Sequence, residues 1–297
     1  MFEKQKANIL FDKLLKRPDI SKAYAMVPPS DSWYDTITKV HESLKEIQKL
    51  DHQELEIISH DNLKLKAIYY PNNEVNKKNI TVICVHGYTS HAEREWAFPG
   101  LFYHSLGYNV LIPYQRAHGL SEGKYISFSA MEQLDMMKWV KKVNEIDGST
   151  QIIIHGLSMG GGIVLQLVNK EMKNVKCLIS DAPSISVENF FKRRSESVFK
   201  KNNDKIYYYL KKRYQKEFKV NVEDYDGYET IKEAKYPLLL AAGSKENRVN
   251  SFNKLKEASP LDVDIIILKG CNHGNGMYKK TEEFQSAIKN FLSKYID

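Results

Sequence analysis

The sequence has 297 residues, 42% of them hydrophobic, and a formal net charge of +7, which is enough chain for one large α/β domain with insertions. It contains no uninterrupted apolar run of membrane-spanning length, and its first residues are charged where a signal peptide needs an apolar centre. We therefore expect a cytoplasmic protein without stable membrane insertion, and the absence of any recognition-helix, zinc or RNA-binding motif argues against nucleic acid as its partner.

Residues 1–50 are predicted to form a polar, helical N-terminal extension. A possible helix cap, Ser30 or Asp31, precedes a stretch whose apolar residues recur at helical spacing: Ile37, Val40, Leu44, Ile47 and Leu50. Three roles are open to this extension, because it could brace the domain, pair subunits or cover a site.

Residues 51–297 are predicted to form one α/β domain. Two short alternating segments, 55–59 and 63–70, flank a tight-turn sequence and predict an opening β-hairpin. From residue 80 to a last helix at about 281–295, helical stretches alternate with apolar, strand-like runs: ITVICV, YNVLIP, QIIIHG, VKCLIS, PLLLAAG and VDIIILKG. This alternation predicts right-handed crossovers and a mostly parallel sheet with helices on both faces.

A helical lid is predicted at about residues 187–222, inside a connection that is too long for a plain crossover. Its apolar residues recur every four positions, at Ile206, Leu210, Tyr214 and Phe218, and this stripe could face substrate or simply pack on the domain. Eleven Lys or Arg against four acids between Val187 and Lys219 equal the surplus of the whole chain. The lid also contains the aromatic residues of a plausible apolar acyl pocket: Phe190, Phe191, Phe199, Tyr207, Tyr208, Tyr209, Tyr214 and Phe218.

The strongest chemical signal is the run QIIIHGLSMGGG at residues 151–162, in which a strand leads into Ser158. A nucleophile on a sharp strand-to-helix turn needs small residues two positions before and after it, because side chains there would collide with the strand and the helix. Gly156 and Gly160 satisfy this need. The turn would expose the serine hydroxyl and place the amide of Met159 where it can stabilise an oxyanion.

A pattern as short as GxSxG arises by chance in about one chain of this length in ten, so the surrounding sequence has to support it. Upstream, the first parallel strand ends in HGYT at residues 86–89, where the second oxyanion amide is expected, at Tyr88. Downstream, His273 follows the last predicted strand, on a loop at the carboxyl edge of the sheet. His273 is therefore the expected base for Ser158.

From about residue 54 to residue 296 the chain resembles the α/β-hydrolase superfamily, and within it the bacterial serine aminopeptidase-like and monoglyceride-lipase-like serine hydrolases. Besides the elbow, the resemblance rests on five stretches: SHDNLKLKAIYYP, HGYTS, VLIPYQRAHGLSEG, PLLLAAGSKENRV and CNHG. In the third of these the group normally has Asp where this chain has Tyr114 and Gly where it has Ala117. The resemblance implies an α/β-hydrolase fold, and the two departures concern the geometry of the loop under the active site.

Two carboxylates compete for the role of triad acid. The resemblance puts the acid three residues after the glycine of the PLLLAAG strand, and this position is Glu246, where aspartate is more usual. Asp181, just beyond VKCLIS, is the alternative, since some hydrolases take their acid from that earlier strand. Placement favours Glu246, whose carboxylate would orient His273 and stabilise its protonated form.

No cofactor and no metal are expected, because the nine histidines and three cysteines show no metal-ligand spacing. Cys84 and Cys177 lie in apolar runs, and Cys271 makes the number odd, which predicts reduced thiols. Cys271 is close to His273 in sequence but has no strand-to-helix elbow of its own.

Taken together, these features predict a serine hydrolase that cleaves carboxylic esters of small molecules with an apolar acyl group, through an acyl-enzyme. Ser158 would attack, His273 would transfer the proton, and the amides of Tyr88 and Met159 would hold the oxyanion. A peptidase for small N-terminal residues, a thioesterase and a non-catalytic binding member of the fold are the alternatives. A peptidase would need carboxylates in the lid to bind the substrate ammonium, and the predicted lid is basic. The sequence predicts no particular oligomeric state.

Overall fold

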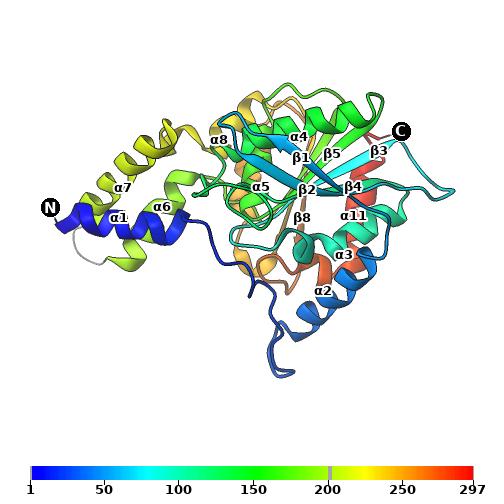
Figure 1. Cartoon of the computed structure of the whole chain (residues 1–297), viewed down its shortest axis with the longest axis horizontal. Coiled ribbons are helices and arrows are strands. Elements are labelled where there is room, and N and C mark those ends of the chain that lie inside the picture. Colours follow the sequence, from blue (N-terminus) through cyan, green and yellow to red (C-terminus); the bar gives the residue numbers. More distant parts are fainter. Residues whose placement is uncertain (1, 200–202, 297) are drawn as a thin grey trace.

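An eight-stranded sheet lies at the centre of the computed structural model, which describes residues 2–199 and 203–296 (Figure 1). In chain order the strands span Gln53–Ile58 (β1), Lys64–Tyr70 (β2), Ile80–Val85 (β3), Asn109–Pro113 (β4), Gln151–Leu157 (β5), Val175–Asp181 (β6), Leu238–Gly243 (β7) and Val263–Leu268 (β8). Across the sheet their order is β1-β2-β4-β3-β5-β6-β7-β8. β2 is antiparallel to β1 and β4, and all other neighbours are parallel. The predicted hairpin and mostly parallel sheet are confirmed.

Helices cover both faces of this sheet, because its central strands are apolar on both sides. They span Phe2–Leu15 (α1), Tyr34–Ile47 (α2), Ala92–Ser105 (α3), Glu132–Ile146 (α4), Met159–Leu167 (α5), Val187–Val198 (α6), Asn203–Phe218 (α7), Gly227–Thr230 (α8), Val249–Ala258 (α9), Gly276–Lys279 (α10) and Thr281–Leu292 (α11), with short 3₁₀ turns at Val222–Asp224, Ile231–Glu233 and Ser244–Glu246. On β3, Ile83 and Val85 pack into the core that contains α4, α5 and α9. Val82 and Cys84 point the other way, toward α2, α3 and α11.

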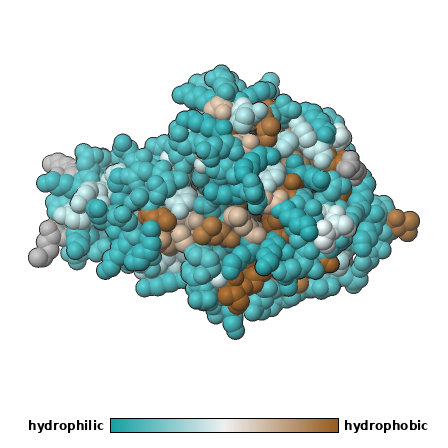
Figure 2. Space-filling view, turned by 90° about the horizontal axis from the view of Figure 1, so that it is seen from above, coloured by the Kyte–Doolittle hydropathy of each residue, from teal (hydrophilic) through white to brown (hydrophobic). Residues whose placement is uncertain are grey.

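Three helices, α1, α6 and α7, lie together beyond the sheet, at the left of Figure 1. We call residues 187–222, which contain α6 and α7, the helical insertion. Ile206, Leu210 and Tyr214 on α7 are fully buried, so the predicted apolar stripe packs inward. α7 lies along α1, and the rings of Phe11 and Phe218 are 6.3 Å apart. On the face seen in Figure 2, the surface at this end of the molecule is mostly hydrophilic.

Residues 16–33, which we call the strap, connect α1 to α2 without forming a helix, so the predicted helical extension of residues 1–50 contains two helices and a non-helical segment between them. The predicted cap at Ser30 or Asp31 is also wrong, because α2 begins only at Tyr34 and the Asp31 carboxylate accepts the N–H of Trp33 at 2.8 Å. The strap is held by hydrogen bonds from side chains of the domain and not by the backbone hydrogen bonds of a helix. Arg94 on α3 donates to the carbonyl oxygens of Ser21 at 3.1 Å and Ala23 at 2.6 Å.

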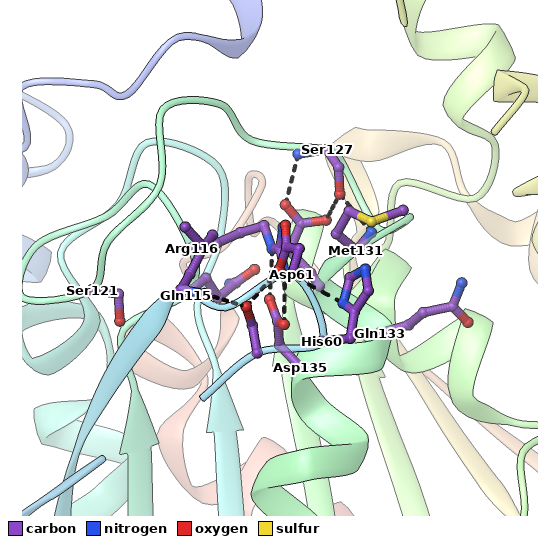
Figure 3. A network of polar contacts seen from close by, with 12 residues as sticks. His60, Asp61, Gln115, Arg116, Ser121, Ser127, Met131, Gln133 and Asp135 are labelled. Carbon is purple, nitrogen blue, oxygen red and sulfur yellow. Dashed lines mark hydrogen bonds and ion pairs between the residues drawn. The ribbon is translucent and has the colours of Figure 1, made fainter. Parts of the chain in front are cut away.

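A buried ionic network joins the opening hairpin, the loop after β4 and α4 (Figure 3). Arg116, which is 2% exposed, donates to both carboxylate oxygens of Asp135 at 2.6 and 2.8 Å. It also donates to both oxygens of Asp61, at 2.8 and 3.0 Å. Next to this network, Glu132 accepts the N–H groups of Ser127 and Ser129 at 2.7 and 2.9 Å. Arg116 thus fixes the loop that the resemblance places under the active site.

Replacing Arg116 by Met is expected to lower the free energy of unfolding by about 3–5 kcal/mol, since it leaves the Asp135 carboxylate buried without its partner. The Asp135 side chain is only 1% exposed, so water cannot replace the guanidinium. Urea unfolding followed by circular dichroism measures the loss. The control is Lys232→Met, which removes an exposed pair with Glu229 and should cost under about 1 kcal/mol. Equal losses in the two variants would contradict a stabilising role for the network.

No helix in the described part of the chain has both the length and the apolar character that crossing a membrane requires.

Candidate active site

Ser158 lies on a sharp turn between β5 and α5, with φ 59° and ψ −111°. The two flanking glycines allow this turn, as the sequence predicts. A Cβ on Gly156 would lie 2.2 Å from the carbonyl oxygen of Gly160, and a Cβ on Gly160 would lie 2.0 Å from that of Val85. Side chains at either position would therefore force the strand and the helix apart, and the serine hydroxyl would lose its place at the edge of the sheet.

His273 lies between Ser158 and Glu246. Its Nε2 is 2.9 Å from the Ser158 Oγ, and its Nδ1 is 2.6 Å from Oε2 of Glu246. Glu246 is in the 3₁₀ turn after β7, where its other oxygen accepts the N–H of Gly243 at 3.1 Å. Three loops at the carboxyl ends of β5, β7 and β8 thus bring these side chains into one hydrogen-bonded series.

The two candidate acids lie in different electrostatic surroundings. Burial raises the pKa of Glu246, but the hydrogen bond from His273 and the charges of His273 and Arg248 lower it by more, so the net pKa is below the ordinary value. Asp181 is at the end of β6, where its backbone oxygen accepts the N–H of Ser158 at 2.8 Å. Burial, followed by the charges of Glu246 and Glu95, raises the pKa of Asp181 well above its ordinary value. Within the described residues, the Asp181 side chain makes no hydrogen bond to His273.

The two predicted oxyanion amides belong to Met159, which follows Ser158, and to Tyr88. Met159 is the first residue of α5, so its amide has no acceptor within the helix. Tyr88 is in the loop after β3, and its side chain is fixed from outside that loop. The Tyr88 hydroxyl donates to the Leu14 carbonyl oxygen at 2.6 Å, and its ring centroid is 5.5 Å from Phe128 and 6.1 Å from Phe190.

Ser158 and His273 open onto a pocket of about 310 Å³. The strap contributes Ala23, Tyr24 and Trp33 to its wall, and the loop after β3 contributes residues 87–90. Within the described residues, the helical insertion contributes nothing to the lining, although its aromatic residues were expected to form the acyl pocket. The lining also includes the buried carboxylate of Glu95, which the sequence analysis did not single out.

This fold and this arrangement of loops define an α/β hydrolase. Residues 76–225 match the family model described as serine aminopeptidase, S33, and the chain belongs to that family. No curated protein matches the sequence.

Solved structures give the same fold. An esterase from Pyrococcus furiosus is 27% identical and superposes with a TM-score of 0.66, over 85% of this chain and 94% of that one. Est1E from Butyrivibrio proteoclasticus, solved with ferulic acid, is 18% identical over 82% of this chain and 99% of its own, with a TM-score of 0.61. An α/β hydrolase from Vibrio vulnificus is 17% identical over 98% and 94% of the two chains, with a TM-score of 0.62. The last two likenesses concern the fold alone.

Proposed function

We propose that the protein is a serine esterase whose nucleophile is Ser158, with His273 as its base and Glu246 as the acid. The observation that supports this most directly is the hydrogen-bonded series from Ser158 through His273 to Glu246, with distances of 2.9 and 2.6 Å. A serine hydroxyl is a weak nucleophile until a neighbouring base takes its proton, and an imidazole needs a carboxylate to hold its orientation.

In the proposed reaction, Ser158 Oγ forms a bond to the ester carbonyl carbon while its proton passes to Nε2 of His273. The amides of Tyr88 and Met159 donate to the oxyanion, and Glu246 stabilises the imidazolium through Nδ1. Collapse of the tetrahedral intermediate breaks the bond to the alcohol oxygen, which takes the proton from His273. Water then attacks the acyl-enzyme with His273 again as base, which releases the acid and restores Ser158.

The surroundings of the pocket favour an ester over the α-ammonium substrate of an aminopeptidase. Glu95 is the carboxylate next to Ser158 in the lining, and both its oxygens already accept hydrogen bonds, from Gly87 N–H at 2.7 Å and Tyr24 OH at 3.0 Å. About half of the lone-pair sites of this carboxylate are therefore already occupied, which leaves it less able to hold a substrate ammonium. The likeness to an esterase from Pyrococcus furiosus agrees with this preference.

The same pocket favours a compact, apolar acyl group on a small-molecule substrate. Tyr24, Trp33, Tyr88 and Leu157 provide much of its wall, and about 310 Å³ is at the lower end of the volumes of ligand sites.

Two further parts of the proposal concern the domain and its location. We propose that residues 187–222 act as a lid on the hydrolase domain, residues 51–297, through Phe190, whose ring is 6.1 Å from that of Tyr88. A cytoplasmic location is proposed on the basis of three buried cysteines without disulfides, Cys84, Cys177 and Cys271.

The test is a comparison of leaving groups combined with active-site labelling of the wild-type protein. We expect hydrolysis of p-nitrophenyl acetate and butyrate, little hydrolysis of amino-acid p-nitroanilides or acyl thioesters, and a fluorophosphonate adduct that mass spectrometry maps to Ser158. Preferred hydrolysis of the anilides would instead indicate a peptidase. A folded protein that neither labels nor hydrolyses any ester would be a non-catalytic binding member of the fold.

A further inference from the structure

The loop that carries the Tyr88 amide is fixed at the preceding residue, Gly87, whose backbone N–H and carbonyl oxygen are both hydrogen-bonded. Glu95 Oε1 accepts the Gly87 N–H at 2.7 Å. On the other side, His86 Nε2 accepts the N–H of Gln115 at 3.1 Å, so the ring proton is on Nδ1, which donates to the Gly87 carbonyl oxygen at 2.8 Å. The position of the oxyanion amide therefore depends on two buried side chains.

Glu95 in turn depends on the strap. It projects from α3 and is only 5% exposed, and its second oxygen accepts the hydroxyl of Tyr24 at 3.0 Å. A buried carboxylate is costly unless donors surround it, so the Tyr24 hydroxyl helps to keep Glu95 ionised and able to accept the Gly87 N–H. Burial already raises the pKa of Glu95, which makes each remaining donor more important.

The strap holds Tyr24 in a defined position. Tyr24 has φ 57°, an unfavourable backbone conformation for an aromatic residue, and such strain persists only where surrounding contacts impose it. His41 Nε2 is 2.8 Å from the Tyr24 carbonyl oxygen, and Arg94 donates to the carbonyl oxygens of Ser21 and Ala23. The Tyr24 side chain lies in the wall of the pocket together with Trp33, at the other end of the strap.

We propose that the strap forms part of the active site. Tyr24 positions the loop that carries the Tyr88 amide, through Glu95 and Gly87. Trp33 closes the subsite that receives an apolar substrate group. This inference rests on the proposed esterase function. In it, Tyr24 is a positioning residue, whereas Trp33 limits the size of the acyl or alcohol group that fits beside Ser158.

The first test is Tyr24→Phe, which keeps the ring in the pocket wall and removes only the hydroxyl. Loss of one hydrogen bond to a carboxylate is expected to lower kcat by about tenfold while KM changes little, because the affected amide acts mainly in the transition state. The rate of fluorophosphonate labelling should fall in parallel. The matched control is Tyr208→Phe, which removes an exposed hydroxyl on the helical insertion and should leave both rates unchanged.

The second test is Trp33→Ala, measured with p-nitrophenyl esters from acetate to decanoate. We expect kcat/KM for the longest esters to rise relative to that for acetate. Met26→Ala, which truncates an exposed side chain of the same strap outside the pocket lining, should keep the wild-type profile. Thermal unfolding of each variant shows that the comparison is made between folded proteins.

The possible outcomes distinguish a failure of the proposed strap roles from a failure of the proposed esterase function. If wild type hydrolyses esters but Tyr24→Phe matches Tyr208→Phe in kcat and labelling, the positioning role is overturned and the esterase stands. An unchanged acyl profile in Trp33→Ala overturns the subsite in the same way. A wild-type protein without turnover or labelling overturns the esterase function and this inference with it.

Discussion

The Ser158→Ala variant is expected to lose about 10⁶-fold in kcat for ester hydrolysis and all fluorophosphonate labelling. The change removes the hydroxyl that lies 2.9 Å from His273 Nε2 and leaves no other nucleophile on the elbow. Cys271 cannot replace it, because it is 1% exposed and burial raises the pKa of its thiol, which keeps the reactive thiolate scarce. Initial rates at saturating ester and gel-based labelling measure the two losses.

The fold should survive this change, so the loss can be assigned to chemistry. Alanine has no more side chain than the strained turn already accommodates, and the Ser158 backbone bonds to Asp181 and Ser184 stay in place. The control Ser197→Ala, on the exposed side of α6, should keep full activity. Residual turnover within tenfold of wild type in Ser158→Ala would mean that the nucleophile lies elsewhere.

The sheet and the elbow could be predicted from sequence because their causes are local. Each buried parallel strand needs an unbroken apolar run, and β3, with all six residues buried, has the sequence ITVICV. The elbow depends on close backbone approaches that only glycine permits, and Gly156 and Gly160 lie at the two positions where a Cβ would collide. His273 could be predicted from its place after the last strand, on a loop at the carboxyl edge of the sheet.

The strap and Glu95 could not be predicted, because their causes lie far away in the chain. Pro28 and Pro29 are a local signal against a continuous helix, but nothing near them indicates that the segment crosses the active site. That path is fixed by Arg94, more than sixty residues later. Glu95 looks in sequence like an exposed helix residue, and it is buried because Gly87 and Tyr24 supply its donors.

The aromatic residues of the insertion made an apolar acyl pocket plausible, but none of those that the structure describes lines the pocket at Ser158. Phe191 and Tyr214 are fully buried, and the Tyr214 hydroxyl donates to the Ser127 carbonyl oxygen at 2.5 Å. These two aromatic residues therefore stabilise the attachment of the insertion to the domain. A helical stripe shows that a face is covered, but its pattern does not distinguish a protein core from a substrate.

The two departures from the resembling group are accommodated within the loop after β4. The Tyr114 hydroxyl donates to Glu93 at 2.6 Å, and its ring lies where a side chain at position 119 would be, 2.3 Å from a Cβ built on Gly119. Ala117 adopts φ 60°, the left-handed conformation that explains why glycine is usual there. With Arg116 fixing the segment between them, the loop keeps its course in spite of both changes.

Glu246→Gln is expected to lower kcat by about 10⁴-fold, whereas Asp181→Asn should remain within tenfold of wild type. A carboxamide at position 246 can present its NH₂ group to Nδ1 of His273, which stabilises the tautomer whose Nε2 carries a proton and cannot accept one from Ser158. Burial raises the pKa of the Asp181 carboxyl well above its ordinary value and so favours its neutral form, which a carboxamide resembles closely. Saturating ester kinetics of the two variants form a matched pair, since each exchanges one oxygen for NH₂.

The pH dependence of wild-type activity and the activity of Glu246→Asp give two further tests of Glu246 as the triad acid. The pKa of Glu246 is below its ordinary value, so Glu246 stays ionised through the neutral range and its protonation should not limit wild-type activity there. Glu246→Asp restores the residue that is usual in the resembling group but shortens the side chain by about 1.5 Å, so we expect activity between wild type and Glu246→Gln. If Asp181→Asn lost more activity than Glu246→Gln, the acid would come from β6, and the 2.6 Å contact of Glu246 with His273 would only hold the loops together. The length of glutamate is compatible with the acid role because its second oxygen is bound to Gly243, which fixes the longer side chain in one orientation.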